Sequence, residues 1–96
     1  MEAAMTFPQS NSSVEQLEIL LELAKDMGYE VRYETLGGVG GGTCEYAGRK
    51  CLFVDITLGV LEQLDSVSRA LGNDPQVALY EMTRDQEIAL CKRKAA

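Results

Sequence analysis

The hydrophobic period of the chain changes at Gly28, and this change constrains the fold more than any other feature. Before Gly28, apolar residues recur at the spacing of one helix face: Val14, Leu17, Leu20, Leu21, Ala24 and Met27. Over residues 29–34, aromatic or aliphatic side chains alternate with charged ones, which indicates a half-buried strand. Glycine at the junction suits the left-handed conformation that ends many helices. A helix that ends near Gly28 and a strand that follows it are therefore predicted.

The first helix has two overlapping start signals. Ser12–Glu15 and Ser13–Gln16 each match the capping box, in which two side chains satisfy two free backbone groups reciprocally. The residues before them are mostly small and polar and include Pro8. We therefore expect a flexible N-terminal tail over residues 1–12 and a single domain over residues 13–96.

The segment TCEYAGRKCLFVDI, residues 43–56, predicts a β-hairpin. If Ala47–Gly48 forms a two-residue turn, Cys44 lies directly opposite Cys51. A turn at Gly48–Arg49 instead places Cys51 opposite Tyr46. The second half of the hairpin is the most strand-like run in the chain, so we expect it at the centre of the sheet.

A second amphipathic helix follows the hairpin, with Gly59 as its cap and Gly72 at its end. Its apolar stripe consists of Leu61, Leu64, Val67, Ser68 and Leu71. Helices on one face of a sheet are the economical packing for this order of elements. We therefore predict an α+β fold: a small three-stranded antiparallel sheet with helices packed on one face.

The C-terminal region contains two further start signals. Asp74–Pro75 combines a capping residue with proline at the first helical position, and Thr83–Gln86 is another capping box. These signals predict a short segment over 75–82 and a helix over 84–93. One continuous helix is the alternative.

The chain contains no histidine, so the commonest general base is missing. Ser-His-Asp and Cys-His catalysis in their usual forms are excluded. The three cysteines lack the paired spacing of a zinc site. We therefore expect no catalytic residue, no metal and no cofactor, and favour a protein that is not an enzyme.

The net charge of −6 disfavours non-specific binding to nucleic acid and to anionic membrane surfaces. The N-terminal stretch lacks the basic region and apolar run of a secretory signal, and no segment has the ~18 apolar residues of a spanning helix. An odd number of cysteines fits a reducing compartment. We therefore expect a cytoplasmic protein with no nucleic-acid partner and no membrane contact.

Five glycines within residues 37–42 invite comparison with phosphate-binding loops. The dinucleotide fingerprint fails because Thr43 or Glu45 occupies its third glycine position, and the P-loop fails because no lysine follows Gly42. A strand follows the loop, so no helix N-terminus is present to hold an anion. We favour a mobile strand connection whose glycines permit positive φ angles, with a loop that contacts a ligand or a protein as the alternative.

Three carboxylates accompany this loop. Glu34 and Glu45 flank it, and Asp55 ends the predicted central strand. A lone aspartate in that position is more often a cap or a turn former than a catalytic group, but three convergent carboxylates suit a hard cation. The candidate ligand-binding or partner-binding residues are therefore Glu34, Gly37, Gly38, Gly40, Gly41, Gly42, Glu45 and Asp55.

Cys44 and Cys51 form a candidate redox pair across the hairpin. Their separation is not that of a Cys-x-x-Cys motif, and neither residue lies at a helix N-terminus that would lower its pKa. We therefore favour small buried thiols that stay free, close in space and on the same face of the sheet.

Several of these segments together resemble a group of short uncharacterised bacterial proteins. The shared pattern is Arg-x-Glu over 32–34, Gly-Gly-x-Cys ending at Cys44, Gly-Arg-Lys over 48–50 and Phe-Val-Asp ending at Asp55. The match covers about residues 29–72. The resemblance implies a small α+β domain with no established activity.

A chain of 96 residues buries a modest core, so self-association is a common source of added stability. Together with the missing catalytic groups, this predicts a non-enzymatic protein-interaction module that forms a homodimer or binds another protein. The alternative is a protein that binds a small ligand or a divalent ion through the glycine-rich loop 37–42 and the nearby carboxylates.

Overall fold

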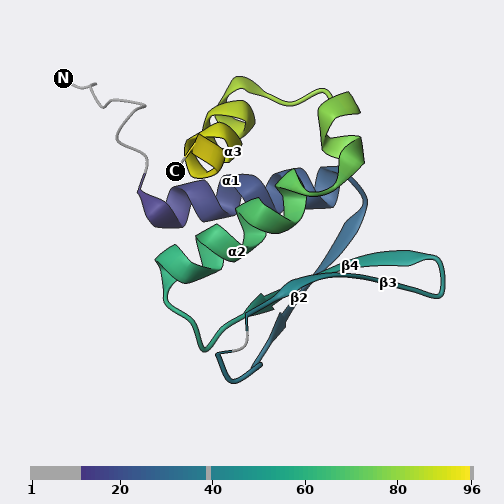
Figure 1. Cartoon of the computed structure of the whole chain (residues 1–96), viewed down its shortest axis with the longest axis vertical. Coiled ribbons are helices and arrows are strands. Elements are labelled where there is room, and N and C mark those ends of the chain that lie inside the picture. Colours follow the sequence, from purple (N-terminus) through teal and green to yellow (C-terminus); the bar gives the residue numbers. More distant parts are fainter. Residues whose placement is uncertain (1–11, 39, 96) are drawn as a thin grey trace.

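The computed structural model describes residues 12–38 and 40–95 (Figure 1). The elements in chain order are α1 (Ser13–Asp26), β2 (Tyr29–Glu34), β3 (Gly42–Tyr46), β4 (Arg49–Asp55), α2 (Val60–Gly72), the 3-10 helix η2 (Pro75–Leu79) and α3 (Arg84–Ala95). The predicted α+β class is confirmed. The expected tail lies outside the described residues except for Ser12, which caps α1.

The sheet has the strand order β2–β4–β3 and is mixed, so the prediction of an antiparallel sheet is wrong. β3 and β4 form the predicted antiparallel hairpin, whereas β2 runs parallel to β4, with Glu34 beside Asp55. The cause is the connection between β2 and β3. It crosses the end of β4 and begins β3 on the far side of that strand, instead of turning back beside β2. The expected central position of β4 is confirmed.

The hairpin turn is Ala47–Gly48, with φ angles of 52° and 79°. Positive φ at both central residues is what a two-residue type I′ turn requires. Cys44 therefore lies opposite Cys51, and Glu45 lies opposite Lys50. The alternative turn at the next residue is wrong.

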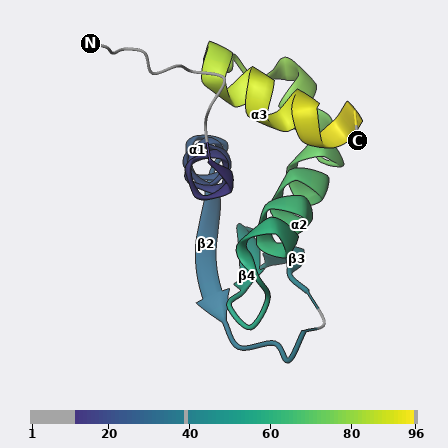
Figure 2. The same cartoon turned by 90° about the vertical axis from the view of Figure 1, so that its left-hand side faces the viewer.

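α1 and α2 lie on one face of the sheet, and α3 lies across both helices on the side away from the sheet (Figures 1 and 2). The most deeply buried apolar side chains come from the sheet and from these first two helices: Leu20, Leu23, Ala24, Leu52, Val54, Leu64, Val67 and Leu71. Each buried leucine or valine contributes roughly 1.5–3 kcal/mol relative to exposure. The core therefore lies between one face of the sheet and two helices.

The predicted capping boxes begin the helices as expected, and the structure shows which of the two boxes at the start of α1 is used. Ser12 and Glu15 exchange reciprocal capping bonds of 3.1 Å, so the box that begins at Ser13 is not used. Thr83 and Gln86 make the same reciprocal pair. The C-terminal region therefore divides into η2 and α3, and the single continuous helix is wrong.

Three residues predicted on buried faces are exposed. Val14 is 49% exposed, Leu61 is 59% exposed and Tyr33 is 56% exposed. The two helical residues lie in the first turns of α1 and α2, and Tyr33 is the last residue but one of β2. The end of that strand extends beyond α1 (Figure 2). A hydrophobic period predicts a face but does not show where the neighbouring layer ends.

Candidate functional site

Asp55 lies at the end of β4 and is 1% exposed. The backbone N–H of Leu36 donates to its Oδ1 at 3.1 Å, and the N–H groups of Gly38 and Gly40 each donate to its Oδ2 at 3.0 Å. Thr57 donates twice to Oδ1, from its N–H at 3.0 Å and from its hydroxyl at 2.6 Å. Since a carboxylate has about four lone-pair sites, these donors occupy its accepting capacity.

The glycine-rich loop is thus arranged around a carboxylate of the protein itself. Converging backbone N–H groups are what a phosphate-binding loop offers to an anion, and here the anion is Asp55. Gly37, Gly38 and Gly40 have φ angles of 71°, 83° and 93°, which other residues rarely adopt. The interpretation of Asp55 as a turn-forming residue is confirmed, and hydrogen bonds attach the loop to the end of the central strand.

The charge of Asp55 is stabilised by this arrangement. Burial by itself raises the pKa of a carboxyl group, but the hydrogen bonds from Thr57, Gly40 and Leu36 outweigh burial and hold the pKa of Asp55 well below its usual value. Asp55 is therefore ionised near neutral pH and is a poor proton donor or acceptor. Its geometry is that of a structural anion.

At Gly41 the loop passes in contact with β4. A Cβ atom at this position would lie 1.8 Å from the carbonyl oxygen of Phe53 and 2.8 Å from its carbonyl carbon. No real side chain fits such a separation, so this crossing requires glycine. The glycines of the loop therefore have two roles: some adopt positive φ angles, and Gly41 allows the loop backbone to pass close to the backbone of β4.

The structure brings together only part of the candidate set. Glu34 is the β2 neighbour of Asp55, and its carboxylate lies 3.5 Å from the guanidinium of Arg32. Glu45 lies toward the other end of the sheet, opposite Lys50. The three carboxylates do not converge, and the described residues contain no group of three or more His, Cys, Asp or Glu side chains that could hold a metal ion.

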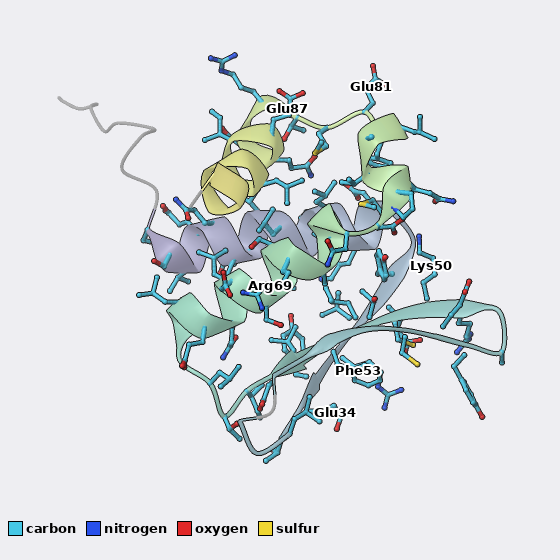
Figure 3. All side chains as sticks on the ribbon, viewed as in Figure 1. Glu34, Lys50, Phe53, Arg69, Glu81 and Glu87 are labelled. Carbon is cyan, nitrogen blue, oxygen red and sulfur yellow. The ribbon has the colours of Figure 1, made fainter. Side chains whose placement is uncertain are left out.

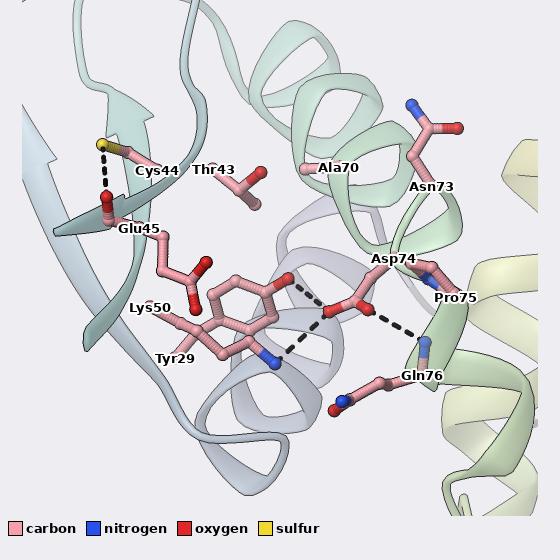
Figure 4. Close-up of a pocket in the computed structure, with 10 residues that line it drawn as sticks. All are labelled: Tyr29, Thr43, Cys44, Glu45, Lys50, Ala70, Asn73, Asp74, Pro75 and Gln76. Atoms are coloured by element: carbon pink, nitrogen blue, oxygen red, sulfur yellow. Dashed lines mark hydrogen bonds and ion pairs between the residues drawn. The ribbon is translucent and has the colours of Figure 1, made fainter. Parts of the chain in front are cut away.

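A polar cluster that the sequence did not predict lies between the hairpin and the end of α2 (Figure 4). The Tyr29 hydroxyl donates to Oδ2 of Asp74 at 2.5 Å. Nζ of Lys50 lies 3.4 Å from the same oxygen and 4.4 Å from the centre of the Tyr29 ring. Oδ1 of Asp74 accepts from the N–H of Gln76 at 2.9 Å and caps η2. The cap was the sequence signal for Asp74, but no local signal indicated its distant partners.

The cluster shifts the ionisation of two of its members. Burial, and then the hydrogen bond and charge of Asp74, raise the pKa of the Tyr29 hydroxyl far above its ordinary value. Hydrogen bonds from Tyr29 and from the N–H of Gln76, together with Lys50, lower the pKa of Asp74. A groove of about 450 Å³ opens beside the cluster, with Thr43, Glu45 and Asn73 also in its lining.

The second face of the sheet has a different character. Alternation along the strands places on this outer face Glu30, Arg32, Glu34, Cys44, Tyr46, Arg49, Cys51 and Phe53. Figure 3 shows Phe53 and Glu34 on the side of the sheet away from the helices and Lys50 on the helix side. No helix in residues 12–38 and 40–95 lies on the outer face (Figures 1 and 2).

The outer face has charged side chains along β2 and at Arg49, and apolar side chains along β4 and β3. Tyr46 is 72% exposed, Phe53 is half-buried, and Cys51 is 8% exposed. Cys44 is exposed, so the prediction of two buried thiols is wrong for Cys44, although both thiols are free as expected. An edge strand has no neighbour on one side to cover its side chains, which accounts for the difference.

The charged side chains of the outer face, Glu30, Arg32, Glu34 and Arg49, form its rim and pair with one another. The Arg32 guanidinium lies 3.9 Å from Glu30 and 3.5 Å from Glu34, and the Arg49 guanidinium lies 3.7 Å from Glu30. Because these side chains are about half exposed or more, each pair contributes only about 0–1 kcal/mol to stability. Their sign and placement therefore bear more on association than on the stability of the monomer.

Comparison with family models, with curated proteins and with solved structures yields no match to this chain. Among the described residues, no helix has both the length and the apolar character needed to cross a membrane. The loop, the groove and the outer face are the parts of the structure that bear on function.

Proposed function

We propose that this protein is a non-enzymatic interaction module that forms a homodimer through the outer face of its sheet. The observation that carries the proposal is the charge of that face. The chain has a net charge of −6, yet the exposed rim combines two acidic residues, Glu30 and Glu34, with two basic residues, Arg32 and Arg49. Two acidic copies meet with least repulsion where each presents a neutral surface.

The symmetry of a dimer favours such a surface. In a two-fold interface the same patch lies on both sides, so the patch must complement itself. A rim that carries both signs meets this condition, because Arg32 of one copy can face Glu30 or Glu34 of the other. A rim of one sign would not.

The β4 and β3 part of the outer face supplies apolar area. Tyr46 and Phe53 are of the aromatic type that is enriched in interfaces and often dominates their binding energy. Cys51 lies beside them on β4 and adds little polarity. An apolar patch bordered by polar side chains is the ordinary anatomy of a protein–protein interface.

Sedimentation equilibrium of the full chain tests the proposal. The wild-type protein is expected to reach twice its monomer mass of 10.5 kDa at concentrations of up to about 100 μM. Arg32→Glu makes the rim acidic, and Tyr46→Ser removes an exposed ring. Each is expected to weaken the dimer by about tenfold or more, which is about 1.4 kcal/mol.

Two matched variants control for net charge and for lost apolar area. Arg84→Glu makes the same charge change at an exposed position in the first turn of α3, and Leu79→Ser removes an apolar side chain that is 86% exposed on η2. Both should leave the dimer unchanged. A wild-type protein that stays at 10.5 kDa throughout contradicts self-association, and equal effects of test and control variants contradict the outer face.

The second candidate is a protein that binds a small ligand, and the groove beside Tyr29, Lys50 and Asp74 favours it over the glycine-rich loop. In the loop, the N–H groups of Gly38 and Gly40 are occupied by Asp55. The groove has a volume of about 450 Å³, within the range of small-molecule sites. Thermal-shift screening against nucleotides, sugar phosphates and divalent ions tests it. A rise of several degrees that Glu45→Gln abolishes supports the groove, and no shift across the panel contradicts it.

A further inference from the structure

Cys44 and Cys51 are direct neighbours across the hairpin, on the outer face of the sheet. Directly opposed residues of an antiparallel pair have Cα atoms about 4.5–5.5 Å apart. A disulfide needs Cα atoms about 4.4–6.8 Å apart, so the two Cα atoms are already within bridging range. The Cβ atoms of opposed residues are about 4.5–5.5 Å apart, and they must approach each other toward about 3.8 Å as the bond forms. Both thiols are free in this structure.

The two thiols differ in accessibility, and the difference gives each a separate place in a reaction. Cys44 lies on the edge strand β3 and is exposed, whereas Cys51 lies on the central strand and is 8% exposed. Figure 4 shows Sγ of Cys44 beside the carbonyl oxygen of Glu45, at 3.9 Å. A reagent in solution therefore reaches Cys44, and Cys51 is placed to react only with a sulfur already held by its neighbour.

We propose that Cys44 and Cys51 form a thiol–disulfide exchange site that closes reversibly into a cross-strand disulfide when it meets a low-molecular-weight disulfide such as oxidised glutathione. This site goes beyond the interaction module proposed above and acts in the monomer, because a dimer formed through the outer face would cover Cys44. The Ala47–Gly48 turn fixes the register that holds the two residues opposite each other. That turn is what makes the pair a site.

The reaction proceeds in two balanced steps. The Cys44 thiolate attacks one sulfur of the small disulfide, forms a mixed disulfide and releases one small thiolate. The Cys51 thiolate then attacks the Cys44 sulfur, forms the Cys44–Cys51 bond and releases the second small thiolate. The protein loses two electrons and two protons, and the small disulfide gains both electrons and both protons and becomes two thiols.

The hairpin also explains why the bond would be reversible. A disulfide stabilises a protein more when it closes a longer loop of the unfolded chain. Residues 44 and 51 enclose a short segment, and the strand pairing already brings its ends together. The disulfide would therefore add little to the stability of the folded protein. Exposure of Cys44 leaves one sulfur open to attack by a reducing thiol.

Peptide mapping of the full chain after treatment with oxidised glutathione tests the site without any substitution. The native protein is incubated at a series of ratios of reduced to oxidised glutathione, alkylated under denaturing conditions and digested with trypsin. Cleavage after Arg32, Arg49, Lys50 and Arg69 separates the two cysteines. The expected product is peptide 33–49 joined to peptide 51–69, on a protein of unchanged monomer mass.

Single substitutions assign the two steps. Cys51→Ser should accumulate the mixed disulfide on Cys44, and Cys44→Ser should slow the consumption of oxidised glutathione by about tenfold or more. Cys91→Ser is the matched control and should leave the linked peptides unchanged. The proposal is overturned if Cys44 and Cys51 both remain free and are alkylated at every ratio of reduced to oxidised glutathione. It is also overturned if Cys44 forms its disulfide with Cys91, or with a second copy of the chain, and not with Cys51.

Discussion

The hydroxyl of Tyr29 donates a hydrogen bond of 2.5 Å to Oδ2 of Asp74, although the two residues are 45 positions apart in the chain. The bond joins the first residue of β2 to the residue that caps η2. Lys50 of β4 lies 3.4 Å from the same oxygen. One carboxylate therefore connects two strands of the sheet to the start of the C-terminal region.

Tyr29→Phe tests this connection. The substitution removes the hydroxyl and keeps the buried ring, so Asp74 loses a donor. A hydrogen bond to a charged group contributes about 1.5–3 kcal/mol, and the free energy of unfolding in urea should fall by about that amount. Tyr33→Phe is the matched control, because that side chain is 56% exposed and lies outside the cluster. Equal urea midpoints for the two variants would contradict the expected role of the bond.

Asp55→Asn tests the attachment of the glycine-rich loop. The amide has one oxygen where the carboxylate had two, and its NH₂ group would face backbone donors. We expect the melting temperature to fall by more than about 5 °C. Hydrogen exchange of the Gly40 amide should become faster, because this group loses its acceptor, whereas the Gly38 amide also donates to the Thr57 hydroxyl oxygen at 2.9 Å and should change less. Asp26→Asn, at an exposed position in the last turn of α1, should leave both measurements almost unchanged.

Acid should remove the contribution of Asp55. Its pKa is lowered in the folded protein, so the unfolded chain takes up a proton first as the pH falls. The stabilisation is fully present above the ordinary aspartate pKa of about 3.9 and is lost progressively at lower pH. Melting temperatures measured from about pH 6 to about pH 2 should therefore fall more steeply for the wild type than for Asp55→Asn. Parallel curves would show that Asp55 does not contribute in this way.

Gly41→Ala tests the crossing of the loop over β4. The added Cβ would lie 1.8 Å from the carbonyl oxygen of Phe53, so the loop or the strand must move. We expect a loss of about 2–4 kcal/mol in the free energy of unfolding. Gly59→Ala is a suitable comparison, since its Cβ would meet its nearest atom at 3.7 Å, and it should cost less than about 1 kcal/mol. Similar losses for the two variants would show that the close approach is relieved easily.

Gly59→Ser should stabilise the protein. Gly59 caps α2 with φ −71° and ψ 169°, almost the angles of Ser12 at the start of α1, −72° and 166°. The N–H of Gly59 already donates to the Glu62 carboxylate at 3.1 Å, so only the side-chain half of the capping box is missing. A serine hydroxyl should add a few tenths of a kcal/mol, measured as a higher urea midpoint. A lower midpoint would contradict the equivalence of the two caps.

Local patterns in the sequence determined the helix starts, the hairpin and its register. The capping boxes at Ser12 and Thr83 and the turn at Ala47–Gly48 each depend on residues within a few positions of one another. Such signals act in any tertiary context, because the partner groups are held close by the chain itself. The opposition of Cys44 and Cys51 follows from the turn alone.

Only the tertiary structure decided the direction of β2, the purpose of the glycine-rich loop and the Tyr29–Asp74 bond. An alternating strand presents the same pattern whether its neighbour is parallel or antiparallel, so the sequence of β2 did not specify its partner. Once β2 runs parallel to β4, the loop must cross the end of the central strand. There the Asp55 carboxylate accepts hydrogen bonds from the backbone N–H groups of Leu36, Gly38 and Gly40. These contacts join residues 15 to 45 positions apart, and packing of the helices against the sheet selects them.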